Sequence, residues 1–164
     1  MKVRIKKLND NSKIPTQAHS RDFCYDVYAT ACREVEPGIW AYSIGLAFEI
    51  VRPHLREDNY LTPLQMLLSD ENSSVKLSID FRPRSSIWKT GLILSNCEGT
   101  IDELYRGEVL AYFYEVVPGK EKYKIGDRIG QIKLGLTLPI EFEEVKDLNT
   151  NTERGINGFG STGR

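Results

Sequence analysis

Residues 82–108 concentrate side chains that could take part in chemistry. Asp102 follows a polar turn, and a carboxylate in such a place can accept a proton from water. Arg84 and Ser85 precede it with a cation and a hydroxyl, which are groups that bind anions. Taken alone, each has an ordinary explanation as a turn residue, a surface charge or a turn-capping serine. Tyr105 follows three residues after Asp102, and its ordinary explanation is a core or strand-end tyrosine.

Two later features have the same ambiguity. Gln131 lies in a strand otherwise patterned for burial, where an amide can donate hydrogen bonds without adding charge. A solvent-facing strand residue would explain it equally well. Residues 149–164 hold four glycines together with Arg154 and Phe159. Composition alone predicts a mobile tail there.

Other kinds of site have little support in the sequence. The two histidines are not in HExxH spacing, and the three cysteines form no CxxC pair, so we expect neither a protein-built transition-metal site nor a disulfide framework. The glycine-rich tail is not a Walker A loop, because no Gly-Lys-Ser/Thr follows its glycines. An odd number of cysteines without a disulfide pattern favours a reducing cytoplasm.

Composition narrows the functional class. A chain of 164 residues with 40% apolar residues is expected to form one domain with its own core. Charged residues make up 27% but the net charge is only −1, which argues against a general nucleic-acid binder. A local basic pocket stays compatible with that balance. No apolar run reaches 18 residues and the start lacks a signal-like apolar region, so we expect no membrane association.

The elements that must position these residues are mainly short strands. Alternation of apolar and polar residues, with turns at Pro37-Gly38, Pro118-Gly119 and Gly126-Asp127, is typical of a β-rich fold. The expected strands cover residues 3–8, 39–51, 75–81, 91–94, 109–117, 132–138 and 140–145. A capping box that starts at Thr62 predicts a short helix inside an insertion at about 53–74.

The predicted architecture is therefore an all-β, jelly-roll-like barrel or sandwich with a short inserted helix. We expect a single β domain over residues 1–148. Residues 149–164 then form a flexible glycine-rich C-terminal lid.

Five segments, in order along nearly the whole chain, resemble the five motifs of the dUTP pyrophosphatase (dUTPase) family. They are Tyr25-Asp26-Val27-Tyr28-Ala29, Pro83-Arg84-Ser85, Gly99-Thr100-Ile101-Asp102-Glu103-Leu104-Tyr105-Arg106-Gly107, Gly126-Asp127-Arg128-Ile129-Gly130-Gln131, and residues 154–163. Any one segment would be a weak signal, whereas five in the family's order are a strong one.

The resemblance implies hydrolysis of dUTP to dUMP and pyrophosphate, which limits uracil in DNA and supplies dUMP for dTMP synthesis. Asp102 would be the general base that activates water for attack on the α-phosphate. Asp26 would order water at the metal–triphosphate end. Mg²⁺ would be held by the substrate phosphates, with only a water-mediated link to Asp26.

The same resemblance implies a set of substrate-binding residues. Tyr105 would pack under the deoxyribose, and a hairpin from about Asn96 to Val109 would bind uracil through its backbone. Phe159 would stack over the uracil, and Arg154 would pair with the γ-phosphate. The full set is Arg84, Ser85, Ser86, Asn96, Gly99, Ile101, Tyr105, Gln131, Arg154, Phe159, Gly160, Ser161 and Thr162.

Family members of this length form homotrimers with active sites shared between subunits, and we expect the same here. Two departures affect the prediction: Cys24 and Ser86 stand where the family usually has glycine, and Ser86 could require a costly backbone conformation. A dCTP deaminase of the same superfamily is one alternative. A regulatory protein that binds a partner through the insertion is another.

Overall fold

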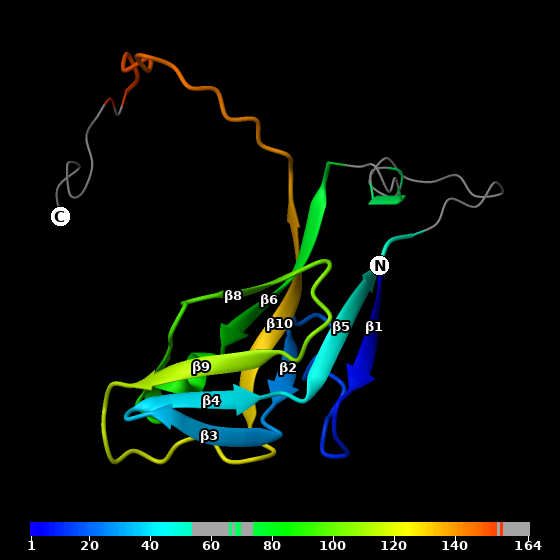
Figure 1. Ribbon diagram of the computed structural model, residues 1–164, viewed down its shortest axis with the longest axis vertical. Coiled ribbons are helices and arrows are strands. Elements are labelled where there is room, and N and C mark those ends of the chain that lie inside the picture. Colours follow the sequence, from blue (N-terminus) through cyan, green and yellow to red (C-terminus); the bar gives the residue numbers. More distant parts are fainter. Residues whose placement is uncertain (54–65, 67, 70–73, 154, 156–164) are drawn as a thin grey trace.

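The computed structural model describes the chain except for residues 54–65, 67, 70–73, 154 and 156–164 (Figure 1). Nearly all regular structure in the described part is β, which confirms the predicted class. The elements are β1 (Lys2–Lys7), β2 (Tyr25–Tyr28), β3 (Ala31–Glu36), β4 (Ile39–Ser43), β5 (Leu46–Val51), β6 (Lys76–Pro83), the 3₁₀ helix η1 (Ser85–Lys89), β7 (Leu92–Leu94), β8 (Gly99–Asp102), β9 (Leu110–Glu115) and β10 (Arg128–Thr137).

The strands form three antiparallel sheets, with the orders β1-β5, β2-β10-β6-β8 and β3-β4-β9-β7. Figure 1 shows the two four-stranded sheets as the two layers of a sandwich, with β1 and β5 beside them. Tyr42 and Phe113 from one layer and Val27 from the other are completely buried. The Tyr42 and Phe113 rings meet edge to face, with their centroids 5.6 Å apart. Hydrophobic burial between the layers therefore supports the strands that carry the candidate site.

The segment 39–51, predicted as one strand, is two strands separated at Gly45. Its φ of +65° favours glycine. A Cβ there would also lie 2.3 Å from the Ser12 hydroxyl oxygen, which donates a hydrogen bond to the Gly45 carbonyl at 2.7 Å. This bend takes the chain from β4, which pairs with β9, to β5, which pairs with β1.

The predicted alternation is confirmed in β6. In β10 it holds only at Ile132, because Leu134 and Leu136 are 38% and 49% exposed. Leu77, Ile79 and Phe81 are buried in the core, while Asp80 points to the other face of the sheet. There Lys133 of β10 donates a hydrogen bond to the Asp80 carboxylate. Burial alone would raise the pKa of Asp80, but the hydrogen bonds from Lys133 and Ser78 lower it overall. The strands β6 and β10 are thus joined by an ion pair as well as by their backbone hydrogen bonds.

One predicted strand is absent from the structure, and two observed strands were not predicted. The predicted strand at 140–145 is wrong: residues 138–148 form no strand, and Ile140 and Phe142 are 69% and 89% exposed. Period-two alternation needs a partner strand, and the described residues offer none to this segment. The strands β2 and β3 were not predicted, because β2 is short and β3 carries charge at half its positions.

The predicted inserted helix falls mostly outside the described residues. Met66, Leu68 and Ser69 are helical, and Leu68 packs into the core. Of the helices that the structure describes, none has the length and apolar character to cross a membrane.

Candidate active site

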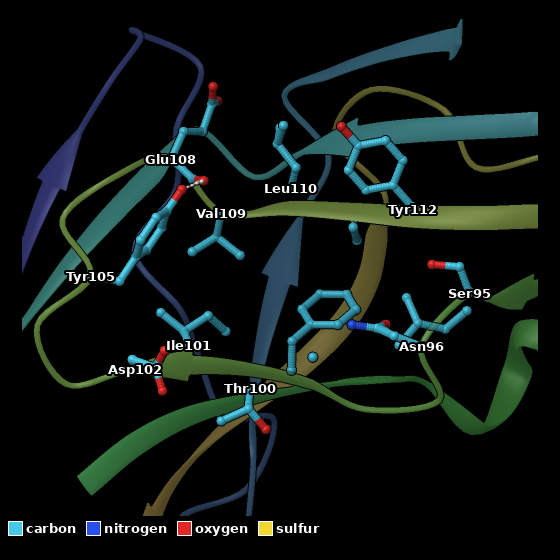
Figure 2. Close-up of a pocket in the computed structure, with 14 residues that line it drawn as sticks. Ser95, Asn96, Thr100, Ile101, Asp102, Tyr105, Glu108, Val109, Leu110 and Tyr112 are labelled. Carbon is cyan, nitrogen blue, oxygen red and sulfur yellow. Dashed lines mark hydrogen bonds between the residues drawn. The ribbon is translucent and has the colours of Figure 1, made fainter. Parts of the chain in front are cut away.

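A pocket of about 350 Å³ lies between β8 and β9. Figure 2 shows Asp102 and Tyr105 at one end of it, Asn96 and Ser95 at the other, and the β9 residues Leu110 and Tyr112 along one side. The structure thus brings together the residues predicted from the third motif and its hairpin. These are Asn96, Gly99, Ile101, Asp102 and Tyr105.

The backbone of β8 is one wall of this pocket. Since β8 is the last strand of its sheet and pairs only with β6, the N–H and C=O groups on its other edge have no strand partner. Gly99 has no side chain beside this edge. A Cβ at Gly99 would meet the Asn96 amide nitrogen and the Phe81 Cβ at 3.6 Å, so the position tolerates contact but has little spare room. Such an edge can pair with a flat heterocycle that carries both donors and acceptors.

The Asp102 side chain is exposed at the end of β8. Within the described part of the chain its carboxylate has no hydrogen-bond or ion-pair partner. Its carbonyl accepts a hydrogen bond from the Tyr105 N–H at 3.0 Å, which fixes the turn that follows. An unpaired carboxylate at the mouth of a pocket has its lone pairs available to a water molecule, as a general base requires.

The position of the Tyr105 ring at the pocket rim is set by two neighbours, Glu108 and Gly107. Its hydroxyl donates a hydrogen bond to the Glu108 carbonyl at 3.0 Å (Figure 2). Its ring passes directly over Gly107, where a Cβ would lie 2.3 Å from the hydroxyl oxygen and 2.5 Å from Cζ. Gly107 thus leaves room for the ring in this position, a role that the sequence pattern did not reveal.

A second pocket, of about 300 Å³, contains the other predicted residues that the structure describes: Asp26, Arg84 and Gln131. Asp26 is 5% exposed. Its carboxylate accepts hydrogen bonds from Gln131 Nε2 at 3.1 Å and from Arg128 Nη1 at 3.0 Å. Arg128 was not singled out from the sequence, although its place within the fourth motif could have suggested it.

Arg84 is the third charged residue of this cluster, and one of its guanidinium nitrogens lacks a hydrogen-bond acceptor there. Its Nε lies 3.3 Å from Asp26 Oδ1, yet this buried nitrogen donates no hydrogen bond in the described part of the chain. The guanidinium groups of Arg84 and Arg128 both face the Asp26 carboxylate, and Asp22 also lines this pocket. A buried donor without an acceptor is costly, and an anionic ligand would satisfy it.

Ser85 and Ser86 open the helix η1 and do not line either pocket in the described chain. Of the described residues other than glycine, only Cys97 has a positive φ, so Ser86 adopts a backbone conformation open to any residue. The expected strain from a serine in place of glycine is therefore absent. Arg154, Phe159, Gly160, Ser161 and Thr162 lie outside the described residues.

The two pockets lie far apart within one chain. Asp26 and Asp102 are on β2 and β8, the opposite edges of one sheet, about 14 Å apart at the usual strand spacing of about 4.8 Å. Along the strands, Asp26 is level with Gln131 and Arg82, whereas Asp102 is level with Ser78. Four residues of strand add about 13 Å, so the backbone positions of the two aspartates are about 19 Å apart.

The sequence model of the dUTPase family matches residues 74–163, which is more than half of the chain. The chain belongs to the dUTPase family. Among similar curated proteins, the deoxyuridine 5'-triphosphate nucleotidohydrolase of Clostridium novyi is 33% identical, with 99% of each chain covered. The enzyme of the same name from Nautilia profundicola is 32% identical over the whole of both chains.

Solved dUTPase structures share the fold. A variant of the Staphylococcus bacteriophage 80alpha dUTPase with dUpNHpp matches with a TM-score of 0.72 and 19% identity, covering 99% of both chains. The dUTPase of phage phi11 of S. aureus, described as having a species-specific insert, matches with a TM-score of 0.62 and 15% identity, covering 92% of this chain and 99% of the phage protein.

Proposed function

We propose that this dUTPase family member hydrolyses dUTP to dUMP and pyrophosphate, with Asp102 as the general base. The observation that carries the proposal is the Asp102 carboxylate, which has no partner among the described residues. It lies beside a pocket that has a free strand edge on one side and Tyr105 at its rim. Asp102 takes a proton from a water molecule that attacks the α-phosphorus. A correctly placed base of this kind contributes about 10²- to 10⁴-fold to the rate.

Substrate selection follows from the walls of the same pocket. The uracil pairs with the free backbone edge of β8 near Gly99, and Ile101 supplies apolar contact. The Tyr105 ring packs under the deoxyribose and faces the 2′ position with carbon. A ribose 2′-hydroxyl buried there without a partner costs about 1–3 kcal/mol, which disfavours UTP.

The second pocket suits the triphosphate. Arg84 offers its buried Nε, and Gln131 has a second amide N–H beyond the one that it donates to Asp26. We assign the hydroxyls and backbone N–H groups of Ser85 and Ser86, at the start of η1, to the phosphates, although neither residue lines this pocket in the described chain. Residues 149–164, which include the fifth motif, close over the nucleotide as the lid of a β domain that spans residues 1–148.

Magnesium fits this donor set as an ion carried mainly by the substrate. Within the described residues, no group of three acidic, histidine or cysteine side chains is arranged to hold a metal. Both Asp26 oxygens already accept hydrogen bonds, which suits contact through water rather than direct ligation. When bound, Mg²⁺ polarises the phosphates and neutralises charge on the leaving pyrophosphate. A structural Mg(II) ion in a phage phi11 dUTPase variant supports magnesium as the relevant metal in this family.

Each active site is shared between chains. A separation of about 19 Å keeps Asp102 and Asp26 of one chain from meeting the same phosphates, because hydrogen bonds span only about 3 Å. A homotrimer in which the Asp102 pocket of one subunit faces the Asp26–Arg84–Gln131 pocket of another solves this problem. All three cysteines are free, in accord with the proposed cytoplasmic location.

Pyrophosphate release from dUTP, dTTP, dCTP and UTP, with and without Mg²⁺, tests the function. We expect release from dUTP that depends on Mg²⁺, with far lower rates for the other nucleotides. Ammonia release from dCTP, with no pyrophosphate from dUTP, would overturn the proposal in favour of a deaminase.

A further inference from the structure

We propose that Arg52 is a positioning residue for catalysis, because it fixes the loop that carries Asp102 and Tyr105. This inference rests on the function proposed above. Arg52 directly follows β5, and Glu103 directly follows Asp102 at the end of β8. Arg52 Nε and Nη2 donate to the two carboxylate oxygens of Glu103 at 2.6 and 2.7 Å. The side chains are only 18% and 19% exposed.

The pair joins three strand ends. Arg52 Nη2 also donates to the Val75 carbonyl at 2.9 Å, just before β6 begins. The backbone ladder between β6 and β8 stops at Ser78 and Asp102. One step further, the Leu77 N–H donates to the Glu103 carboxylate at 3.4 Å. The Glu103 side chain therefore continues the pairing with β6 after the backbone of β8 has turned away.

The Arg52–Glu103 pair, called the clamp below, is linked by hydrogen bonds to the turn of residues 102–106 that carries Asp102 and Tyr105. The Tyr105 N–H donates to the Asp102 carbonyl, and Arg106 Nη1 donates to the Glu103 carbonyl at 2.6 Å. A rotation of the Asp102–Glu103 peptide would move the base and the tyrosine together. A parallel, bidentate guanidinium–carboxylate pair resists such rotation better than a single contact. The hydrogen bonds from Arg52 also hold the pKa of the Glu103 carboxyl below its usual range, so the pair stays charged near neutral pH.

Its sequence position makes Arg52 easy to overlook. It lies outside all five motif segments, at the start of the insertion, where a charged residue is expected to be exposed on the surface. Its half-buried partner in the motif is Glu103, which the sequence shows only as a neighbour of Asp102. Their proximity is a product of the fold.

The test compares Arg52→Met with Arg52→Lys and a matched control, Lys122→Met, in the full-length protein. Lys122 pairs with Glu115 at 2.7 Å, with 22% and 14% exposure, at the far end of β9 from the pocket. For Arg52→Met we expect kcat for dUTP to fall about 10- to 100-fold, a range typical of a misplaced catalytic group, with KM changing less. Arg52→Lys should recover part of the lost kcat, because lysine keeps the positive charge but cannot donate the two parallel hydrogen bonds of a guanidinium group.

Amide hydrogen exchange at Tyr105 supplies a readout that does not depend on turnover. Exchange should speed up at least several-fold in Arg52→Met and stay at the wild-type rate in Lys122→Met. Unchanged exchange, or an unchanged kcat in a folded Arg52→Met protein, would overturn the proposal. If Arg52→Met does not fold, the same two readouts on Arg52→Lys decide. Absence of dUTP hydrolysis in the wild type would instead refute the proposed function, and the exchange result would still judge the clamp.

Discussion

Replacing Gly107 by alanine should relax the rejection of UTP without unfolding the protein. The new Cβ would lie 2.3 Å from the Tyr105 hydroxyl oxygen and 2.5 Å from its Cζ, well inside contact distance. Gly107 does not have a positive φ, so alanine meets no backbone strain. The conflict falls on the end of the tyrosine side chain, which must move by about an ångström and lose its 3.0 Å hydrogen bond to the Glu108 carbonyl.

The size of the expected change in selectivity follows from the free-energy cost of placing the 2′-hydroxyl of UTP against the Tyr105 ring. If Tyr105 leaves the 2′-hydroxyl of UTP without a partner at a cost of about 1–3 kcal/mol, the ring contributes about 5- to 150-fold to selectivity. Displacing it should lower the ratio of kcat/KM for dUTP over UTP by a factor in that range. The lost hydrogen bond should cost about 0.5–1.5 kcal/mol of unfolding free energy.

The assay is steady-state pyrophosphate release with each nucleotide, alongside thermal unfolding. Tyr105→Phe is the matched control, because it loses the same hydrogen bond but leaves the ring in place. It should therefore keep most of the selectivity. An unchanged dUTP-to-UTP ratio in Gly107→Ala, or an equal fall in both variants, would refute the reasoning about the ring.

Three further changes have defined outcomes. Asp102→Asn should keep the fold and dUTP binding but lower kcat about 10²- to 10⁴-fold, and near-normal turnover would exclude its role as base. Gly130→Ala places a Cβ 2.2 Å from Phe81 Cζ in the core, so chemical denaturation should show a loss of about 1–3 kcal/mol, and no loss would mean that the ring relaxes freely. Because Arg52 lowers the pKa of Glu103, the stability advantage of the wild type over Glu103→Gln should be full above about pH 4.3 and vanish as the pH falls through the folded-state pKa. Urea midpoints from pH 7 to pH 3 measure this, and a pH-independent difference would contradict it.

The burial of β6 was predictable from its strict alternation, whereas the same alternation in β10 leaves Leu134 and Leu136 exposed. The buried positions of β6 are Leu77, Ile79 and Phe81. The bend at Gly45 was not predictable, because the apolar run continues through it and its cause is a contact with Ser12 from a distant segment. The predicted strand at 140–145 fails for the opposite reason: the alternation is present, but no described strand of the same chain pairs with it.

The candidate site shows the same division. The motif pattern pointed to Asp102, Tyr105, Asp26, Arg84 and Gln131, and the structure gathers them into two pockets. The sequence does not state that these pockets are far apart, because strand order is a tertiary property. It also hides supporting contacts across long sequence separations, such as the pair of Arg52 with Glu103.

The central claim is that dUTP is hydrolysed in sites built from the Asp102 pocket of one chain and the Asp26–Arg84–Gln131 pocket of another. The most direct test mixes two inactive variants, Asp102→Asn and Arg84→Met, by co-expression with different tags and tandem purification. In a mixed trimer one site receives both intact residues, so dUTP hydrolysis should return to about a third of the wild-type rate per trimer. Mixed oligomers no more active than either parent would show that Asp102 and Arg84 of the same chain serve one site, and would contradict the account.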